Sequence, residues 1–469
     1  MGRYDLWKHQ QGFVDFASTR DHVIGDMCMG SGKTWSALQI LCEEWRSRLV
    51  LIFAPKSVVS TVWPKAVREF VDDEWRIVPL TQSAVPARLK KLKSEGKQWV
   101  TDEKPGTLAF VVNYEATNNE KMLAQLVRVP WEAVIADEVH RIKGPKAKVS
   151  KNVAKIFHGC RKRIGLTGTL MPHSPGDLWA QMRAIKPEVF GKSYFRFYRQ
   201  YGVMGGYQGK QVVSWVNTDE MMERCRDVVY RVTEEDANLN LPEMRNEYVE
   251  LELSPKARKA YDDLEADAIA QVEAGLITAS NGLVKLLRLM QLTSGLAVTE
   301  ELDELGEVVG RVESIVDTSK LEWLTDLFID NPGRPIVVFG RFNVDLANVH
   351  KAAAAAGVGS LELSGARREL EEWQQGEQPI LAVQIGAGAE GVDLTRASRC
   401  VFMSTGLRSG DLQQALKRAH RPGQTDHVLN TFLVCRKTVD VTITQAHRNR
   451  KKFVDAVLDY LRAKQEEPA

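Results

Sequence analysis

Two stretches of this chain alternate short apolar runs with segments of helical hydrophobic period, one within about the first 180 residues and one from residue 319 onward. The apolar runs are dense in Val, Ile, Leu and Phe without alternating polar residues, as expected for strands covered on both faces. Such strands, separated by helices, predict parallel sheets built from βα units. The expected strands are 22–25, 48–55, 106–114, 131–138 and 163–169 in the first stretch, and 334–341, 360–365, 379–386, 399–405 and 427–435 in the second.

The segment between these stretches differs in composition. From about residue 190 to about residue 300 it is richer in charged residues and helix formers, as in "SPKARKAYDDLEADAIAQVEAG", and its apolar runs are few. The sequence therefore predicts an α/β fold class in which two lobes with parallel sheets flank a mostly helical middle segment. A length of 469 residues also fits two domains better than one.

Composition narrows the classes of function. A hydrophobic content of 44% and a charged content of 26% are typical of a soluble globular protein, and a net charge of +2 requires any nucleic-acid site to be a local patch. The six cysteines are scattered without a CxxC pair, which argues against a zinc site or a disulfide framework. The N-terminus "MGRYDLWKHQ" lacks a signal-peptide stretch, and no apolar run approaches ~18 residues. We therefore expect a cytoplasmic protein.

The segment "HVIGDMCMGSGKTWSALQILCEEW" is typical of a strand, a glycine-containing loop and a helix. Gly30 and Gly32, on either side of Ser31, allow backbone N–H groups to close around phosphate oxygens at a helix N-terminus. Lys33 can then reach the β- and γ-phosphates of a nucleotide, and the Thr34 hydroxyl can ligate Mg²⁺. The motif alone would also fit a glycine turn that caps a helix, and Met27 replaces its usual first glycine.

Asp137 and Glu138 end the apolar run "WEAVIADE", which places two carboxylates at the carboxyl edge of a buried strand. Ligands of open α/β sheets bind at that edge. Asp137 can hold Mg²⁺ through its water shell, and Glu138 can orient or deprotonate the attacking water. His140 could relay between this site and a neighbouring loop. By itself such a pair is more often a helix cap or a solvated turn.

The segment "QALKRAHRPGQ" predicts a helix that projects Arg418 and Arg421 from one face. Two guanidinium groups aimed the same way suit one dense negative charge, such as a polyphosphate. A solvated basic helix face is the alternative for the helix taken alone.

Together with "LTGTLMPHSPGDLW" and "AGAEGVDLTRASRCVF", these motifs follow the order of helicase superfamily two and cover nearly the whole chain. The wording of "LTGT", "GVDLT" and "RAHRPGQ" resembles the Snf-type (SWI/SNF) ATPases. The resemblance implies two RecA-like lobes that clamp ATP and Mg²⁺ between them, with Arg418 and Arg421 as arginine fingers from the second lobe. It implies an ATP-binding lobe over 1–188, a helical insertion and linker over 189–318, and a C-terminal lobe over 319–460.

The resemblance also implies roles around the nucleotide. Gln10 matches the family's adenine-reading glutamine, with Gln11 as the alternative in a shifted register. Gln414 completes the finger motif. In "GAGAEGVDLT", Gly388, Glu390, Gly391 and Asp393 match the segment that joins nucleotide to nucleic acid, and we assign Gly391 and Asp393 to the nucleotide.

The motif Thr167, Gly168 and Thr169 is implied to couple the site to lobe movement. The family's next residue is usually Pro, where this chain has Leu170, and Pro172 and His173 follow.

Nucleic-acid contacts are likewise implied by motifs that face nucleic acid in the family. They match Lys56, Ser57, Thr61, Trp63, Asn113, Tyr114 and Arg341. The basic runs 88–93, 141–151 and 447–452 fit either a binding patch or solvated faces. In "SYFRFYRQYG" (193–202) the aromatic residues fall at helical spacing, which favours a packed helix face over base stacking.

The function implied by the resemblance is a DNA-stimulated ATPase that translocates along duplex DNA, gripping phosphates, without separating the strands. A strand-separating DNA helicase and an ATP-regulated nucleic-acid-binding module remain alternatives. The compact chain suggests a bacterial or bacteriophage protein, in the host cytoplasm if viral.

Overall fold

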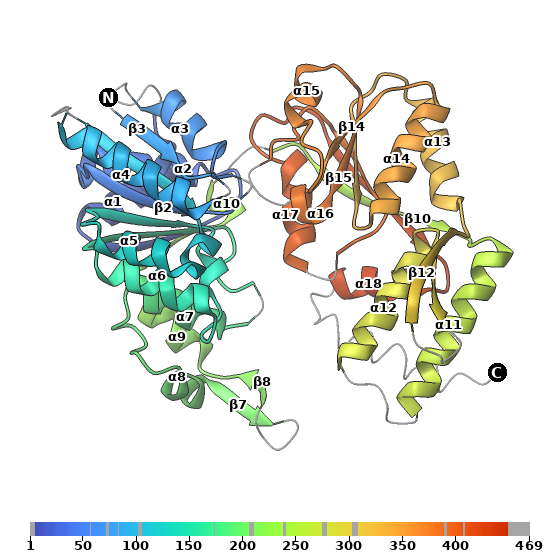
Figure 1. Ribbon diagram of the computed structural model, residues 1–469, viewed down its shortest axis with the longest axis horizontal. Coiled ribbons are helices and arrows are strands. Elements are labelled where there is room, and N and C mark those ends of the chain that lie inside the picture. Colours follow the sequence, from blue (N-terminus) through green and yellow to red (C-terminus); the bar gives the residue numbers. More distant parts are fainter. Residues whose placement is uncertain are drawn as a thin grey trace. The chain divides into compact units, whose positions relative to one another are not determined.

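The computed structural model describes residues 5–56, 58–71, 75–82, 84–101, 106–172, 174–205, 211–237, 241–273, 279–302, 308–388, 392–406 and 409–448. The chain forms two compact units, Met1–Leu239 and Asn240–Ala469 (Figure 1). Each unit contains its own parallel sheet. The boundary between them falls inside the middle segment expected over 189–318, so each unit takes part of that segment.

The first unit is built on a seven-stranded parallel sheet in the order β3-β4-β2-β5-β6-β1-β9. All five strands expected from apolar runs are present. The edge strands β3 and β9 were not predicted, because their sequences, WRIVP and VYRV, carry Arg among apolar residues. The strands are β1 His22–Met27, β2 Leu49–Ala54, β3 Trp75–Pro79, β4 Thr107–Asn113, β5 Ala133–Asp137, β6 Lys162–Thr167 and β9 Val229–Val232.

Helices cover both faces of this sheet because its central strands are apolar on both sides. In β2, Leu51 and Phe53 join one hydrophobic cluster, whereas Val50 and Ile52 join the other. The first cluster is completed by α4 Val85–Thr101, α5 Glu120–Arg128, α6 Lys148–His158, α7 Asp177–Ile185 and the 3₁₀ turns η2 Tyr114–Asn118 and η3 Val139–Ile142. The second is completed by α1 Lys8–Ser18, α2 Lys33–Gln39, the π-helix η1 Ile40–Glu44, α3 Val62–Phe70 and α10 Glu234–Ala237.

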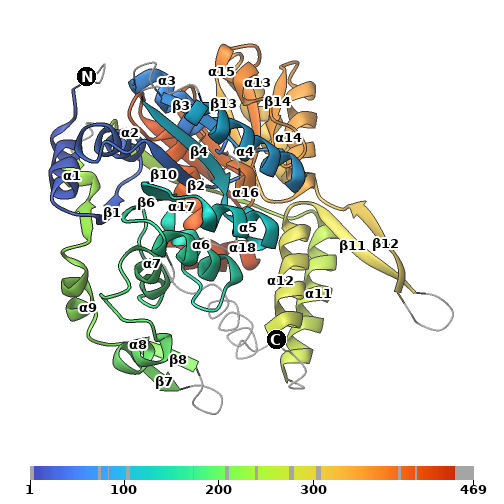
Figure 2. The same ribbon diagram turned by 60° about the vertical axis from the view of Figure 1, so that its left-hand side comes forward.

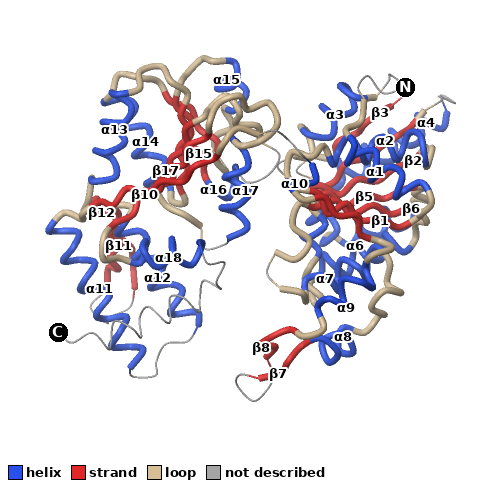
Figure 3. The backbone as a smooth tube through the Cα atoms, turned by 180° about the vertical axis from the view of Figure 1, so that it is seen from behind, coloured by secondary structure: helices blue, strands red, loops and turns tan. Residues whose placement is uncertain are grey.

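A small subdomain lies at one end of the first unit (Figure 3). It contains a two-stranded antiparallel sheet separate from the main sheet, and one helix on either side of that hairpin in sequence. Its elements are α8 Tyr194–Tyr201, β7 Gly202–Gly205, β8 Gln211–Trp215 and α9 Thr218–Cys225.

The second unit is built on a six-stranded parallel sheet in the order β10-β17-β16-β13-β15-β14. All five predicted strands are present, and β10 is an addition from the segment expected to be mostly helical. Its sequence MRNEYVEL mixes polar and charged residues with apolar ones, because a strand at the edge of a sheet is only partly covered. The strands are β10 Met244–Leu251, β13 Ile336–Gly340, β14 Ser360–Leu363, β15 Ile380–Gln384, β16 Arg399–Phe402 and β17 Val428–Cys435.

Helices also cover both faces of the second sheet. One face packs against α13 Ser319–Asp330 and α14 Asn343–Ala355, and the other against α15 Leu370–Gln375, α16 Ile385–Gly388 and α17 Ser409–Ala419. A third cluster joins α11 Pro255–Glu273, α12 Ala279–Thr293 and α18 Val439–Arg448. Next to α11 and α12, the antiparallel hairpin of β11 Leu296–Leu302 and β12 Val308–Ile315 projects from the unit (Figure 2).

Two parallel sheets, each covered by helices on both faces, confirm the expected α/β class with two RecA-like lobes. Within the ranges given above, no helix is both long and apolar enough to cross a membrane.

Candidate nucleotide-binding site

Sheet order brings three sequence motifs to one edge of the first unit. Strand β1 leads into the phosphate loop, β5 ends at Asp137, and β6, which pairs with both, ends at Thr167. The register pairs Asp26 with Thr167 and Asp137 with Leu166. Since parallel strands share their carboxyl edge, the loop, the acidic pair and the motif after β6 are neighbours, where open α/β sheets bind ligands.

The phosphate loop is tightly turned at its two glycines. Gly30 and Gly32 have φ angles of 80° and 77°, in the left-handed region that glycine adopts without strain. A Cβ atom on Gly32 would displace the amide of Gln10, and the positive φ angle would strain any L residue there. The Lys33 ammonium donates to the carbonyls of Met27 at 3.0 Å and Cys28 at 3.1 Å. The loop thus combines two glycines in left-handed conformation with a cation at the start of α2.

Buried side chains support this loop from beneath. The Ser31 hydroxyl donates to the Cys28 carbonyl at 2.7 Å, and the Ser31 carbonyl accepts from Nε2 of Gln10 at 3.0 Å. Nε2 of His9 lies 2.9 Å from the same oxygen, which identifies Nε2 as the protonated nitrogen. Oε1 of Gln10 accepts from the Trp7 N–H at 2.9 Å. Gln10 therefore supports the loop through hydrogen bonds, and its contact with adenine stays a prediction. The contact between His9 and the loop was not predicted, because a single histidine forms no recognisable motif.

Thr34 follows Lys33 in α2 and is half-buried. The buried residues Trp35 and Leu38 lie on α2, Leu41 on the following π-helix η1, and Trp45 directly after it. These anchors fix the start of the helix, and with it Thr34, relative to the sheet. The hydroxyl of Thr34 and the carboxylate of Asp137 are the groups that fit Mg²⁺, since hard cations prefer oxygen ligands.

Asp137 is held by two buried aromatic residues. Its Oδ2 accepts from Nε1 of Trp63 at 2.9 Å, and its backbone carbonyl accepts from the Tyr114 hydroxyl at 2.6 Å. Trp63 and Tyr114 are 0% and 1% exposed, so the expectation that these side chains face nucleic acid is wrong. Asn113 is also buried and bonds Arg88 at 3.0 Å. The aromatic rings turn inward because burying them in the sheet's flanking clusters removes large apolar areas from water.

Glu138 starts a chain of polar contacts that reaches the motif after β6. Its φ angle is 55°, a left-handed conformation that is uncommon outside glycine and clusters at functional sites. Its Oε2 lies 3.3 Å from Nδ1 of His140, which lies 3.0 Å from Oγ1 of Thr167. Oγ1 of Thr167 accepts in turn from the Thr169 N–H at 3.0 Å. Both contacts of His140 are made by the same ring nitrogen, and the relay through this residue stays a prediction.

Asp26 is a half-buried carboxyl group that sequence reasoning did not single out. Burial raises its pKa above the ordinary value, although the positive charges of Arg231 and Lys33 oppose that shift. Arg231 Nε lies 3.7 Å from Asp26 Oδ2. The signal that could have identified it is a carboxylate inside the apolar run "HVIGDM".

In the second unit, the predicted helix contains Arg418 but ends at Ala419, so the expectation that Arg421 shares it is wrong. Pro422 and Gly423, with a φ angle of 100°, follow and stop the helix. Arg418 is buried, and its carbonyl accepts from the Leu394 N–H at 3.1 Å. Nη1 of Arg421 donates to the Val392 carbonyl at 3.2 Å.

The segment that contacts these arginines is fixed by local hydrogen bonds. Oδ1 of Asp393 accepts from the N–H of Thr395 at 3.0 Å and from its hydroxyl at 2.8 Å. Nε2 of the buried Gln424, which was missed, donates to the carbonyls of Thr395, Ala397 and Ala419. Gln414 is half-buried on α17. Ser57, His173, Glu390, Gly391 and part of the basic run at 447–452 lie outside the described residues.

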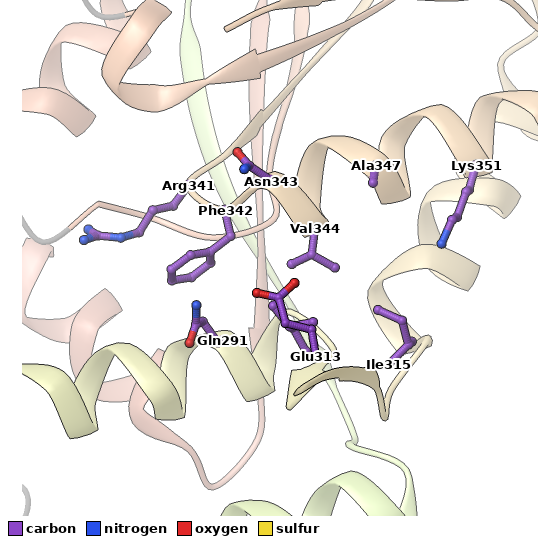
Figure 4. A pocket seen from close by; sticks show the side chains of 10 residues that line it. Gln291, Glu313, Ile315, Arg341, Phe342, Asn343, Val344, Ala347 and Lys351 are labelled. Atoms are coloured by element: carbon purple, nitrogen blue, oxygen red, sulfur yellow. The ribbon is translucent and has the colours of Figure 1, made fainter. Parts of the chain in front are cut away.

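Arg341 lies beside a cavity of about 570 Å³ between α12, the β11–β12 hairpin and α14. Figure 4 shows its guanidinium extending to one end, with Lys351 at the other and the Phe342 ring between. The Arg341 N–H donates to Oδ2 of the fully buried Asp345 at 3.0 Å. The lining residues are Gln291, Leu296, Glu313, Ile315, Arg341, Phe342, Asn343, Val344, Ala347 and Lys351.

The helix α8 confirms the preferred interpretation of "SYFRFYRQYG". Phe197 and Tyr201 are buried in the hydrophobic cluster of the first unit. Phe195 remains 55% exposed, with the Arg199 guanidinium 5.6 Å from its ring centre. Packing therefore explains the helical spacing of the aromatics.

Comparison with known proteins gives two family matches. The SNF2-related domain family matches residues 9–295, and the helicase conserved C-terminal domain family matches residues 319–423. The chain is similar to protein p41 of Acyrthosiphon pisum secondary endosymbiont phage 1, with 23% identity over 461 residues, covering 93% of this chain and 94% of that protein.

Two larger relatives match over most of this chain. The Caenorhabditis elegans homolog of SWI/SNF-related matrix-associated actin-dependent regulator of chromatin subfamily A-like protein 1 is 25% identical, covering 93% of this chain and 59% of the relative. The DNA annealing helicase and endonuclease ZRANB3 of Mus musculus is 25% identical, covering 96% of this chain and 40% of that protein. Among solved structures, the Sulfolobus solfataricus SWI2/SNF2 ATPase core in complex with dsDNA aligns with a TM-score of 0.43 at 18% identity, covering 97% of this chain and 94% of that one.

The match to the SNF2-related domain extends over more than half of the 469 residues, and the motifs at the sheet edge lie within it. The resemblance to Snf-type ATPases is thereby confirmed. The chain belongs to the SNF2-related family and is a helicase-like ATPase.

Proposed function

We propose that this protein is a double-stranded-DNA-stimulated ATPase that moves along the duplex without separating its strands. The observation that carries the proposal is the meeting of the phosphate loop, Asp137 and Thr167 at one edge of the first sheet. ATP hydrolysis, with Mg²⁺ neutralising charge on the phosphates, supplies the free energy.

Each residue has a distinct part in this mechanism. Lys33 would exchange the carbonyls of Met27 and Cys28 for phosphate oxygens, and Thr34 and Asp137 would hold Mg²⁺. Glu138 orients the attacking water and accepts its proton. Ser31, Gly30 and Gly32 shape the loop, while Gln10 supports it from below.

The second unit supplies the arginine fingers in this proposal. Arg418 and Arg421 stabilise the charge that develops on the transferred phosphoryl group. Because they belong to a different unit from Lys33, hydrolysis requires the units to close on the nucleotide and allows them to reopen. Asp393, Gly391 and Gln414 would contact the nucleotide from the same side.

Exposed polar groups after β2, including Lys56 and Thr61, would grip DNA phosphates. Such contacts read no sequence and weaken steeply with salt. The ZRANB3 relative is named a DNA annealing helicase and endonuclease, which supports DNA rather than RNA as the nucleic acid that this protein binds.

The test is the ATPase rate with duplex, single-stranded, forked and RNA ligands at two salt concentrations, alongside a strand-separation assay. We expect the largest stimulation by duplex, with no strand separation, and loss of turnover in Lys33→Ala. Stimulation by single strands alone, with separated products, would establish the helicase alternative. Nucleic-acid binding that responds to ATP without any hydrolysis would establish the binding-module alternative.

A further inference from the structure

Two buried aromatic side chains connect Asp137 to the loops that follow neighbouring strands. Trp63, in the first turn of α3, donates its indole N–H to the Asp137 carboxylate at 2.9 Å. Tyr114, directly after β4, donates its hydroxyl to the Asp137 carbonyl at 2.6 Å. Two segments distant in sequence thus converge on one residue.

The sheet order gives this convergence a direction. In the order β4-β2-β5-β6-β1, strand β5 with Asp137 stands between two pairs of strands. On one side lie β6 and β1, which lead to the Thr167 motif and the phosphate loop. On the other side lie β2 and β4, whose following segments lead to Trp63 and Tyr114. Asp137 therefore lies between the strands that lead to the phosphate loop and the Thr167 motif and the strands that lead to Trp63 and Tyr114.

The segment after β2 combines exposed polar residues with buried anchors. Lys56 and Thr61 are exposed, whereas Val58 and Val59 between them are buried, as is Trp63 beyond them. Because close-packed side chains transmit displacement to their neighbours, a ligand that grips the exposed residues can move the segment only together with the indole.

The segment after β4 is built similarly. Asn113 is buried and bonds Arg88 at 3.0 Å and Glu115 at 2.9 Å. Glu115 is exposed and also lies 3.3 Å from Arg141. The charged side chains of Arg88 and Glu115 thus bond directly to Asn113, which precedes Tyr114 in the chain.

We propose that Trp63 and Tyr114 are positioning residues through which duplex DNA bound at these loops sets the orientation of Asp137, and hence the affinity of the site for Mg²⁺-nucleotide. The inference rests on the proposed function, since it takes duplex DNA as the ligand of these loops. Reorienting a group that holds Mg²⁺ changes nucleotide affinity even without hydrolysis, so the coupling is measurable as binding. By thermodynamic linkage, DNA and nucleotide must alter each other's affinity by the same factor.

The experiment measures the Kd of Mg²⁺ with a fluorescent ADP, with and without a saturating duplex. In the wild type we expect the two values to differ by about fivefold or more, the lower range of measured allosteric couplings. In Trp63→Phe, which keeps an aromatic side chain but removes the pyrrole ring with its N–H, the ratio should fall to within about twofold of one. Tyr114→Phe should reduce the ratio less, since Tyr114 contacts the backbone of Asp137 and not its carboxylate.

Two control substitutions remove the same chemical groups, an indole N–H and a tyrosine hydroxyl, from residues that do not contact Asp137. Trp131 is buried and donates its indole N–H to the Leu126 carbonyl at 2.7 Å. It precedes the first residue of β5, at the end of the strand opposite to Asp137. Tyr201 is buried and its hydroxyl accepts from Arg224 at 3.0 Å. Trp131→Phe and Tyr201→Phe should keep the wild-type ratio, and duplex affinity without nucleotide should be unchanged in all four variants.

A folded Trp63→Phe protein that keeps the wild-type ratio would overturn the inference. If Trp63→Phe does not fold, Tyr114→Phe decides, and an unchanged ratio there overturns it. A wild type with no stimulation and a ratio of one for every nucleic acid would instead refute the proposed function, and the inference with it. If duplex DNA stimulates the ATPase activity of the wild type, and Trp63→Phe has a Kd ratio near one, the result supports both the inference and the proposed function.

Discussion

The Lys33 ammonium lies among backbone carbonyls and close to a half-buried carboxyl group. Asp26, in the strand before the loop, has its pKa raised by burial, and the positive charge of Lys33 acts against that shift. Gly168 also lies beside the ammonium group, because a Cβ atom built on this glycine would be 3.6 Å from Nζ of Lys33. The charge state of Asp26 therefore affects the cation that the phosphates would meet.

Replacing Asp26 with Asn removes this titration and predicts a specific pH dependence. With a pKa raised above its ordinary 3.8, the folded protein binds the proton more tightly than the unfolded chain. The resulting stabilisation is full below that value and is lost as the pH rises through the folded pKa. Denaturant unfolding of both proteins from about pH 4 to about pH 8 should show the wild type losing stability relative to Asp26→Asn. A difference independent of pH would contradict the raised pKa.

Glu138→Gln should separate binding from hydrolysis. Gln has nearly the same size but cannot accept a proton from water, so we expect kcat to fall by about 10²–10⁴ while nucleotide affinity changes little. Steady-state rates and fluorescent-nucleotide binding measure the two quantities. Glu120→Gln, on the exposed first turn of α5, is the control and should behave as the wild type. A wild-type kcat in Glu138→Gln would remove Glu138 from the mechanism.

At the scale of elements, a buried ion pair joins the helices of the second unit. Nζ of Lys320, on α13, donates to the Met403 carbonyl at 2.6 Å and to Oδ2 of Asp440, on α18, at 3.0 Å. Oδ1 of Asp440 accepts from the Thr293 hydroxyl of α12 at 2.9 Å. Burial alone would lower the pKa of Lys320, but Asp440 and the other acidic groups around the ammonium, Cys435 and Asp345, together outweigh it and leave the pKa raised. Lys320 therefore stays charged, and its contacts with those of Asp440 hold three helices to the end of β16.

Lys320→Ala should destabilise the second unit by about 3–5 kcal/mol, because it leaves the Asp440 carboxylate buried without its cation. Thermal and denaturant unfolding measure the loss. Arg436→Ala, which breaks an exposed pair with Glu250, is the control and should have no measurable effect. Equal stability of Lys320→Ala and the wild type would mean that the pair contributes nothing to the packing of these helices.

How much the sequence predicts depends on how completely an element is buried. Strands such as β2 and β13, covered on both faces, appear as apolar runs and were predicted within a few residues. The edge strand β10 was not, since its partial exposure permits charged residues that resemble a helical segment. In the candidate site, the positions of Lys33, Asp137 and Glu138 at or after strand ends were predicted from the motifs, and their catalytic roles stay predictions.

The inward position of Trp63 was not predicted, because the motif resemblance assigned it to the surface. The local pattern carried the opposite signal. Ala66, Val67 and Phe70 follow Trp63 at helical spacing and form the apolar face of α3. Hydrogen bonds to Asp137 depend on strand order, which neither motif nor periodicity specifies.

At the scale of the whole molecule, the two units have separate cores, and their strands pair only within each sheet among the described residues. If catalysis draws Lys33 from one unit and Arg421 from the other, as proposed above, it is sensitive to changes that leave each core intact. Stability and activity should respond to different substitutions.

Arg421→Ala tests this separation. We expect kcat to fall by about 10³ or more, as for other arginine fingers, with nucleotide binding and the unfolding transition little changed. Single-turnover hydrolysis, nucleotide binding and thermal unfolding are the measurements. Arg367→Ala, at a half-exposed arginine paired with Glu369 in the same unit, should retain the wild-type rate. Comparable rates for both variants would exclude Arg421 from catalysis.

The chain passes from one unit to the other between two strands that each lie at the margin of their sheet, β9 and β10. Both run parallel to their neighbours, β9 over four paired residues and β10 over eight. Tension along the connection would load these strands lengthwise, so that their hydrogen bonds share the force instead of opening one after another. The attachment through β9 pairs fewer residues than the attachment through β10, so under such tension β9 would separate from its sheet first.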